Sequence, residues 1–347
     1  MRIQEYECLF QPYIDAPPVP GTQLFQNACS NDNITIESWR QTWIDNAKAN
    51  KEYLGSFKDF SIGKLYQKHH YGVAVCAGSG PSLGYNGHHL AKRGKIPLVS
   101  CLHNFHFFED RGIAADYYVS LDAGPVVIEE VSEGGKKSEE EYWELTKDRT
   151  LVAFIGSHPD LFKKWQGEIF VYNAPIPDKA YMDALKEIEP FFVHIGNGGN
   201  VLGACLYFAK AILGVHRVAM VGADFSFAPK GSKFHSWDSK YDKTKGHVIP
   251  VNDVFGHRVH TWPSYKNFKD WFEHLALKIP DASPNPQFFS GWMVNCTEGG
   301  TLGSYPHGNI RQIPQLPLEM FLSELNMSED VRQCVDMPDQ ESGKILF

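Results

Sequence analysis

Short apolar runs alternate along this chain with segments of helical periodicity. Seven runs rich in Val, Ile, Leu and aromatic residues indicate buried strands, at 71–78, 96–102, 116–122, 150–156, 168–173, 191–196 and 217–224. Residues 197–214, between the last two runs, have the pattern of a helix that ends at Gly214. This alternation predicts an α/β fold, Rossmann-like, with a mostly parallel sheet and helices on both faces.

The two ends of the chain differ from this centre. Residues 1 to about 34 look irregular, and a helix is expected from there to about residue 55, because Trp39, Trp43 and Ala47 recur at helical spacing. We therefore expect an N-terminal extension with a helix over 1–65, a catalytic domain over 66–325 and a polar tail over 326–347. The N-terminal helix would be an appendage packed on the main domain.

Three further segments interrupt or follow the strand pattern. Residues 129–149 are strongly charged and predict a solvated loop and helix. Residues 225–250 are long, polar and aromatic, which is typical of an ordered lid loop rather than a linker. After it come a turn, a short strand and an amphipathic helix carrying Phe268 and Trp271, so a C-terminal lid and helical region is expected.

Charge and cysteine content narrow the classes of function. The chain has 347 residues with 33 Lys and Arg against 41 Asp and Glu, a formal net charge of −8, which disfavours stable duplex nucleic acid binding. No signal-peptide pattern and no apolar window long enough for a membrane span are visible, so a cytoplasmic protein is expected. The seven cysteines are far apart, which predicts reduced, buried thiols rather than a zinc site.

The first candidate site is the turn after the first strand, Gly78-Ser79-Gly80-Pro81-Ser82 followed by Leu83. Glycines let a backbone approach a phosphate closely, and amides at the start of the next helix point at an anion. The full dinucleotide fingerprint is absent, because Leu83 stands at the third glycine position, and the turn lacks the P-loop Lys. It is either a nucleotide-binding turn or a tight connection between strand and helix.

A second glycine turn, at 196–200, precedes the helix that ends at Gly214. Asn200 can cap that helix, and the amides of Gly198 and Gly199 can form a second site for an anion. Simple capping is the alternative. Two such turns in one sheet suggest a ligand with more than one polar end, such as a nucleotide and the group attached to it.

Polar side chains at the strand ends complete the candidate set, because ligands of such sheets bind beyond the carboxyl ends of the strands. Asp122 and Asp224 could bind ribose hydroxyls, coordinate magnesium or support their loops. His235, in the loop after Asp224, is suited to deprotonate a hydroxyl. The pairs His103 with His106 and His257 with His260 have metal-compatible spacing but no metalloenzyme motif.

Several blocks in order carry a resemblance: GSGPSL, GIAADYYVSLD, GGNVLGACLYFAKAILGVHRVAMVGADFSF, VNDVFGHRVHTW and VNCTEGGTLG. Together, over roughly residues 72–303, they resemble the MptE-like/Maf family. That family includes 6-hydroxymethylpterin diphosphokinases and motility-accessory flagellin glycosyltransferases, whose core is similar to bacterial sialyltransferases that use CMP-activated nonulosonic acids.

The resemblance implies roles for individual residues. The turn from Gly78 to Ser82 would hold the donor phosphate and sugar, and Asn104, after the second strand, would contact the nucleotide. Tyr172 and Asn173 match a Tyr-Asn pair that binds nucleotide and phosphate. The G-x-D-F pattern matches Gly222, Asp224 and Phe225, and the general base would be His235, with Asp224 and Tyr172 beside it in the catalytic set. Ser79 departs from the Asn that is frequent after the first glycine.

The function expected on this basis is an inverting glycosyltransferase that moves a sugar from a CMP-linked donor to a hydroxyl of a glycan, protein or small molecule. No tightly bound cofactor is required. One alternative is an MptE-like diphosphokinase that transfers diphosphate from ATP to a pterin-like alcohol and uses magnesium held by Asp122 and Asp224. The other is a non-catalytic protein that binds nucleotides or glycans. A homo-oligomer is compatible with every reading.

Overall fold

Seven parallel strands form one sheet in the computed structural model, in the order β5-β4-β3-β2-β1-β6-β9. The structure describes residues 22–70, 72–190, 193–229, 234–237, 246–278, 292–305, 308–309 and 312–327. The predicted parallel α/β, Rossmann-like architecture is confirmed. The strands are β1 (Val73–Ala77), β2 (Leu98–Cys101), β3 (Tyr117–Ser120), β4 (Thr150–Phe154), β5 (Glu168–Tyr172), β6 (Arg217–Val221) and β9 (Met293–Asn295).

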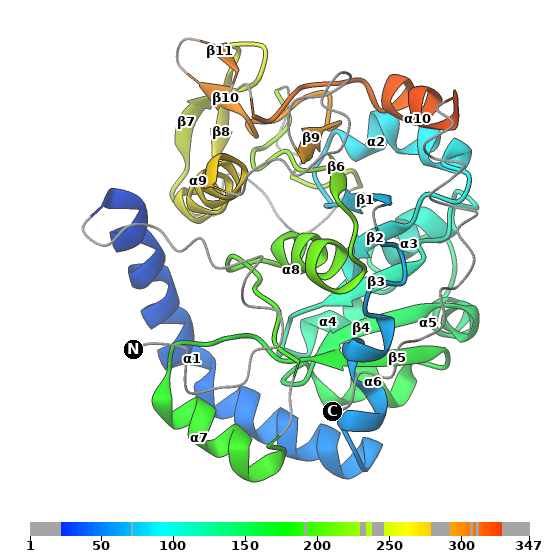
Figure 1. Ribbon diagram of the computed structural model, residues 1–347, viewed down its shortest axis with the longest axis vertical. Coiled ribbons are helices and arrows are strands. Elements are labelled where there is room, and N and C mark those ends of the chain that lie inside the picture. Colours follow the sequence, from blue (N-terminus) through cyan, green and yellow to red (C-terminus); the bar gives the residue numbers. More distant parts are fainter. Residues whose placement is uncertain are drawn as a thin grey trace.

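The strand order reverses between β1 and β6. From β1 the chain adds β2 to β5 on one side, and it then returns to place β6 and β9 on the other side of β1. Because crossovers between parallel strands are right-handed, the two directions of travel place helices on opposite faces. Figure 1 shows α8 on one side of the strands and α3 and α5 on the other.

The helices are short except at the N-terminus and in the region after β8. An antiparallel hairpin, β7 (Ile249–Asn252) and β8 (Arg258–Thr261), precedes α9. The predicted turn, short strand and amphipathic helix correspond to the hairpin turn, β8 and α9, whereas β7 was not predicted. A second small hairpin pairs β10 (Ser304–Tyr305) with β11 (Gly308–Asn309).

The helices are α1 (Gln23–Leu54), α2 (Leu83–Asn86), α3 (Phe105–Glu109), α4 (Val126–Glu129), α5 (Glu139–Leu145), α6 (Pro159–Lys164), α7 (Lys179–Ile188), α8 (Val201–Tyr207), α9 (Pro263–Lys278) and α10 (Leu318–Met327). Short 3₁₀ segments lie at Lys58–Phe60, Ile62–Leu65, Gly87–Lys92, Leu102–Asn104 and Thr146–Asp148, and a π-helical turn at Phe208–Ile212 extends α8.

Helix α1 begins about ten residues earlier than the sequence predicts. No proline lies between Pro20 and Pro81, and Gln23 donates a hydrogen bond to Asn27 one turn later, so polar residues extend the helix beyond its periodic part. The helix also braces the sheet, because the Asn46 amide donates to the carbonyls of Ala123 and Gly156. These carbonyls belong to the loops after β3 and β4, so α1 fixes the loops at the carboxyl edge.

The expected strand at 191–196 is wrong in its described part. Residues 193–196 form no strand, and His194 makes only a single parallel bridge with Asn173 at the end of β5. The segment does pair at the edge of the sheet, through the Asn173 N–H to the Val193 carbonyl and the Ile195 N–H to the Asn173 carbonyl. The apolar pattern of this segment therefore indicates that it is buried at the edge of the sheet, but not that it forms a further strand.

The charged insertion forms more structure than a solvated segment. Ser138 and Glu141 form a capping box at the start of α5, and Tyr142 and Trp143 from the same helix are buried. The described cysteines Cys29, Cys76, Cys101, Cys205 and Cys296 are free thiols, and all except Cys29 are buried, as predicted. In the described part of the chain, no helix is both long and apolar enough to cross a membrane.

Candidate functional site

A cavity of about 290 Å³ opens at the carboxyl ends of the central strands, where the strand order reverses. Ligands of open α/β sheets bind at this place, because the loops after β1 and β6 diverge to opposite faces and leave a crevice. The wall residues come from the ends of β1, β2, β3 and β6, from α4 and the residue after it, from the starts of α8 and α9, and from the segment 234–237. They are Gly78, Ser79, Gly80, Cys101, Leu102, His103, Val119, Ser120, Asp122, Val126, Glu130, Gly199, Asn200, Val201, Leu202, Gly222, Ala223, Asp224, Phe225, Ser226, Phe234, His235, Tyr265 and Phe268.

The turn after β1 is held mainly by its own backbone amides. The N–H of Gly78 donates to Val221, and that of Gly80 donates to the Gly222 carbonyl at 2.9 Å. The Leu83 N–H donates to the Gly80 carbonyl, and Pro81 has no N–H to offer. Most of the backbone amides that were expected to bind a phosphate are therefore already hydrogen-bonded within the protein.

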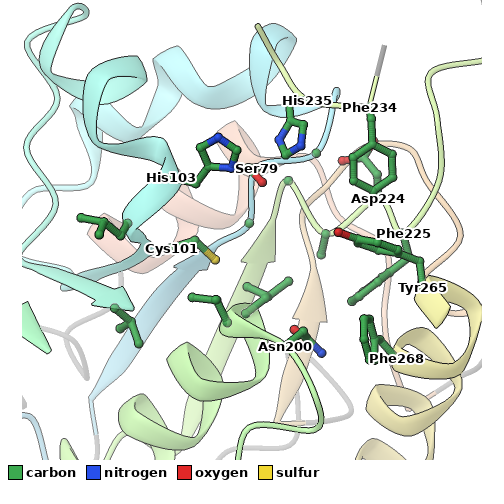
Figure 2. A pocket seen from close by; sticks show the side chains of 18 of the residues that line it. Ser79, Cys101, His103, Asn200, Asp224, Phe225, Phe234, His235, Tyr265 and Phe268 are labelled. Carbon is green, nitrogen blue, oxygen red and sulfur yellow. The ribbon is translucent and has the colours of Figure 1, made fainter. Parts of the chain in front are cut away.

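Ser79 is the exception in this turn. Within the described residues, neither its N–H nor its hydroxyl has a hydrogen-bond partner, and the residue lines the cavity. Its carbonyl accepts from the N–H of Ser236 at 3.2 Å, which ties the segment 234–237 to the turn; much of the expected lid loop, at 230–233 and 238–245, lies outside the described residues. Figure 2 shows the Ser79 hydroxyl between the histidines and the cavity. Ser79 thus offers the two donors of this turn that a ligand can use.

Asp224 clamps the turn from the end of β6. Its Oδ2 accepts from the Ser82 hydroxyl at 2.7 Å and its Oδ1 accepts from the Ser82 N–H at 3.2 Å. Burial raises the pKa of Asp224 to about 7, although the hydrogen bonds from Ser82 act in the opposite direction. A Cβ on Gly80 would lie 2.1 Å from Asp224 Oδ2, so the close approach requires glycine.

Two histidines meet at one wall of the cavity. The rings of His103 and His235 lie 4.7 Å apart between centroids in an edge contact, and Trp237 packs against both. The Nε2 of His103 lies 3.0 Å from Oε2 of Glu133. Burial and the neighbouring His103 lower the pKa of His235 to about 3, so its imidazole is neutral at pH 7.

An aromatic wall, formed by Phe234, Tyr265 and Phe268, faces the histidines (Figure 2). The ring of Tyr265 lies 4.7 Å from that of Phe234 and 5.5 Å from that of Phe268, and Trp262 supports Phe234 from behind. A planar ring of a ligand can stack on such a surface. The cavity therefore has a flat apolar side and a polar side that carries two imidazole rings.

Asp122 and Asp224 do not fit one shared magnesium ion. They follow β3 and β6, which are three strands apart, a lateral separation of roughly 14 Å at the usual strand spacing. Carboxylate oxygens on one Mg²⁺ lie about 3 Å from each other, and Asp224 already accepts two hydrogen bonds. No group of three or more metal-binding side chains is found among the residues that the structure describes.

The second glycine turn reaches the cavity through Gly199 and Asn200. The Asn200 side chain accepts from the Gly203 N–H at 2.9 Å, so the predicted cap of α8 is confirmed. The Gly199 N–H donates to the Asn197 side chain. Gly198 does not line the cavity but packs against Trp271, where a Cβ would lie 2.4 Å from the indole.

Six of the predicted site residues do not line the cavity: Pro81, Ser82, Asn104, Tyr172, Asn173 and Gly198. The buried Asn104 amide donates to the carbonyls of Ala77 and Gly78, so it supports the turn from below. The Tyr172 hydroxyl donates to the carbonyl of Ser120 at 3.1 Å inside the core. Asn173 is buried and bonded to His194 and the hydroxyl of Tyr181. Both Tyr172 and Asn173 stand at β5, four strands from β1.

The sequence reasoning missed other residues that line the cavity. Glu130 and His103 reach it, and the histidine had been considered only as a metal ligand. Tyr265 and Phe268, three residues apart on α9, share a helical face that the amphipathic pattern could have indicated as a ligand surface. Nothing in the sequence places α9 beside the end of β6.

The chain matches a family model described as 6-hydroxymethylpterin diphosphokinase MptE-like over residues 41–230, and no curated protein matches it. Its structure is similar to that of a Maf glycosyltransferase from Magnetospirillum magneticum AMB-1, with 17% identity and a TM-score of 0.51. The similarity covers 71% of this chain and 34% of that one, so this chain corresponds to about a third of that protein's length. At this identity the likeness concerns the fold. The family match includes His103, Glu133 and Asp224 but ends before His235.

Proposed function

Because the chain belongs to the MptE-like family, we propose that it is a transferase that takes a group from a nucleotide-activated donor and delivers it to a hydroxyl acceptor. The observation that carries the proposal is the cavity at the reversal of strand order, where Ser79 faces two histidines across from an aromatic wall. These groups can bind a phosphate, take a proton and stack a ring, which are the three needs of such a transfer.

The walls suggest how the donor lies. The N–H and hydroxyl of Ser79 would donate to the donor phosphate, and charge-assisted hydrogen bonds of this kind are worth about 1.5–3 kcal/mol each. The nucleobase would stack on Tyr265 and Phe268. One of the two cavity histidines, His103 or His235, would then lie on the side where the acceptor hydroxyl loses its proton.

We propose a sugar as the transferred group, from a CMP-linked donor. The ordered sequence blocks support this, and so does the likeness in fold to the Maf glycosyltransferase. The description of the matched family favours a second candidate, transfer of diphosphate from ATP to a pterin-like alcohol. That reaction would use magnesium. Because Asp122 and Asp224 do not fit one shared ion, the magnesium would be held by Asp122 together with other ligands.

The two candidates are separated by product analysis. Purified protein is incubated with CMP-N-acetylneuraminate and a panel of hydroxyl acceptors, and separately with ATP, Mg²⁺ and 6-hydroxymethylpterin, with mass spectrometry of the products. We expect CMP and a glycosylated acceptor from the first mixture. AMP and a pterin diphosphate from the second would establish the diphosphokinase instead, and no product from either would favour a non-catalytic binding protein.

A Ser79→Ala variant tests the donor contact. Loss of the hydroxyl removes one donor to the phosphate, so we expect the Kd for CMP to rise about tenfold or more. Ser304→Ala is the matched control, because its hydroxyl donates to the Asn252 carbonyl on the hairpin and does not line this cavity. Equal affinity in the Ser79→Ala variant and the wild type would contradict the assignment of the phosphate site.

A further inference from the structure

We propose that His103 is the proton acceptor of the transfer and that Glu133 is its positioning residue. The inference rests on the proposed function, since it names the group that takes the proton from the acceptor hydroxyl. It differs from the expectation drawn from the sequence, which placed His235 in that role.

The geometry singles out His103 because it combines access to the cavity with a carboxylate partner. His103 lines the cavity at the end of β2, and its Nε2 lies 3.0 Å from Oε2 of Glu133. Glu133 comes from the charged insertion that follows α4, so two separate segments build the pair. Both side chains are largely buried, at 10% and 19% exposure, which strengthens the interaction between them.

The carboxylate determines which nitrogen can accept a proton. An ionised carboxylate only accepts hydrogen bonds, so the Nε2 of His103 carries the hydrogen and Nδ1 is the free base. Figure 2 shows the His103 ring beside Ser79 and His235, at the polar wall of the cavity. The proton acceptor therefore lies next to the proposed phosphate contact.

The step balances with these groups alone. The O–H bond of the acceptor breaks, its proton moves to Nδ1 of His103, and the oxygen forms a bond to the carbon of the donor sugar. The bond between that carbon and the phosphate oxygen breaks, and its electron pair leaves with the nucleoside phosphate. The imidazolium that forms is stabilised by the charge of Glu133, and the proton then passes to solvent.

The other charged and titratable groups around His103 leave this assignment intact. Asp122, near the ring, can add to the stabilisation of an imidazolium. His106 and His235 pack in the same cluster, and burial lowers the pKa of His106 to about 4 and that of His235 to about 3. Both are neutral at pH 7, so neither adds positive charge beside His103.

The first experiment needs no substrate. In protein labelled with ¹⁵N-histidine, the imidazole shifts distinguish the two neutral tautomers, and the signals of His103 are identified as those missing from His103→Asn. We expect hydrogen on Nε2 in the wild type and a redistribution between the tautomers in Glu133→Gln. Hydrogen on Nδ1 in the wild type would overturn the proposal.

The second experiment is the pH dependence of CMP release from CMP-N-acetylneuraminate in the presence of acceptor. His103→Asn should lose about 10²–10⁴-fold in kcat, the usual contribution of a general base. Glu133→Gln should lose about tenfold, and its acid limb should move to lower pH, because the imidazolium has lost its counter-charge. His88→Asn and Glu140→Gln, both exposed, are the matched controls and should behave like the wild type.

Measurements of CMP binding and of turnover together distinguish a failure of the proposed His103–Glu133 pair from a failure of the proposed function. Thermal stabilisation by CMP should persist in both variants, which shows that they fold and bind. An unmoved acid limb in Glu133→Gln, or a loss in His103→Asn below tenfold, would overturn the role of the pair while the transferase function stands. If the wild type itself uses neither donor, the proposed function fails, and the catalytic assignment falls with it.

Discussion

Replacement of Asp224 by asparagine tests the buried carboxylate that clamps the turn after β1. Asp224 is 6% exposed, and both of its oxygens accept hydrogen bonds from Ser82. An amide has nearly the same shape and keeps one acceptor, and the Ser82 hydroxyl can turn to accept from the new NH₂ group. The variant therefore removes the ionisation of the side chain and little of its packing.

The raised pKa of Asp224 fixes the sign and size of the effect. The folded protein holds this proton up to about pH 7, whereas the unfolded chain releases it near pH 4. Between these values the folded state binds one more proton, so the free energy of unfolding falls as pH rises. A difference of about 3 pKa units at 1.36 kcal/mol each gives about 4 kcal/mol over the whole window, of which about 2 kcal/mol is lost between pH 5 and 7.

Urea unfolding of the wild type and of Asp224→Asn at pH 5, 6, 7 and 8 measures this contribution. Subtraction of the two curves cancels the other titrating groups. The stability of the wild type relative to the variant should fall by about 2 kcal/mol from pH 5 to 7 and level off above pH 7. A difference that is constant, or that grows with pH, would refute the assignment of a protonated, buried carboxyl at this position.

Two other substitutions test packing around the site. Gly80→Ala should lower the free energy of unfolding by about 3 kcal/mol, because the added Cβ would lie 2.1 Å from Asp224 Oδ2. Gly299→Ala is the control, because its added Cβ has no atom within 4 Å. Equal stability of the two variants in urea would contradict this prediction. Tyr172→Phe should cost about 1 kcal/mol through the lost hydrogen bond to the Ser120 carbonyl and leave the affinity for CMP unchanged in calorimetry, and a large loss of affinity would mean that Tyr172 contacts the ligand.

The sequence predicts most of the sheet because buried parallel strands are nearly continuous apolar runs. Six of the seven predicted runs correspond to β1 to β6. The prediction of a strand at 191–196 is wrong because an apolar segment at a sheet edge has the same sequence pattern as a strand. The extension of α1 to Gln23 depends on polar hydrogen bonds, which hydrophobic periodicity does not register.

The site is predicted less well because it depends on strand order. The rule that ligands bind at the carboxyl ends correctly brings Ser79, Asp122 and Asp224 to one cavity. It does not separate them from Tyr172, which also ends a strand but stands four strands from β1, roughly 19 Å away. The contact between His103 and Glu133 joins segments whose proximity no local pattern encodes.

Calorimetric titration and thermal unfolding with CMP, UDP, GDP and ATP, each with and without Mg²⁺, test the central claim most directly. A ligand at 100 times its Kd adds about 2.7 kcal/mol to stability, which is a readily measured shift. The account predicts stabilisation by CMP without metal, weakened in Ser79→Ala. Stabilisation by ATP with Mg²⁺ alone would contradict the proposed sugar donor, and no response to any nucleotide would contradict a nucleotide-dependent transferase.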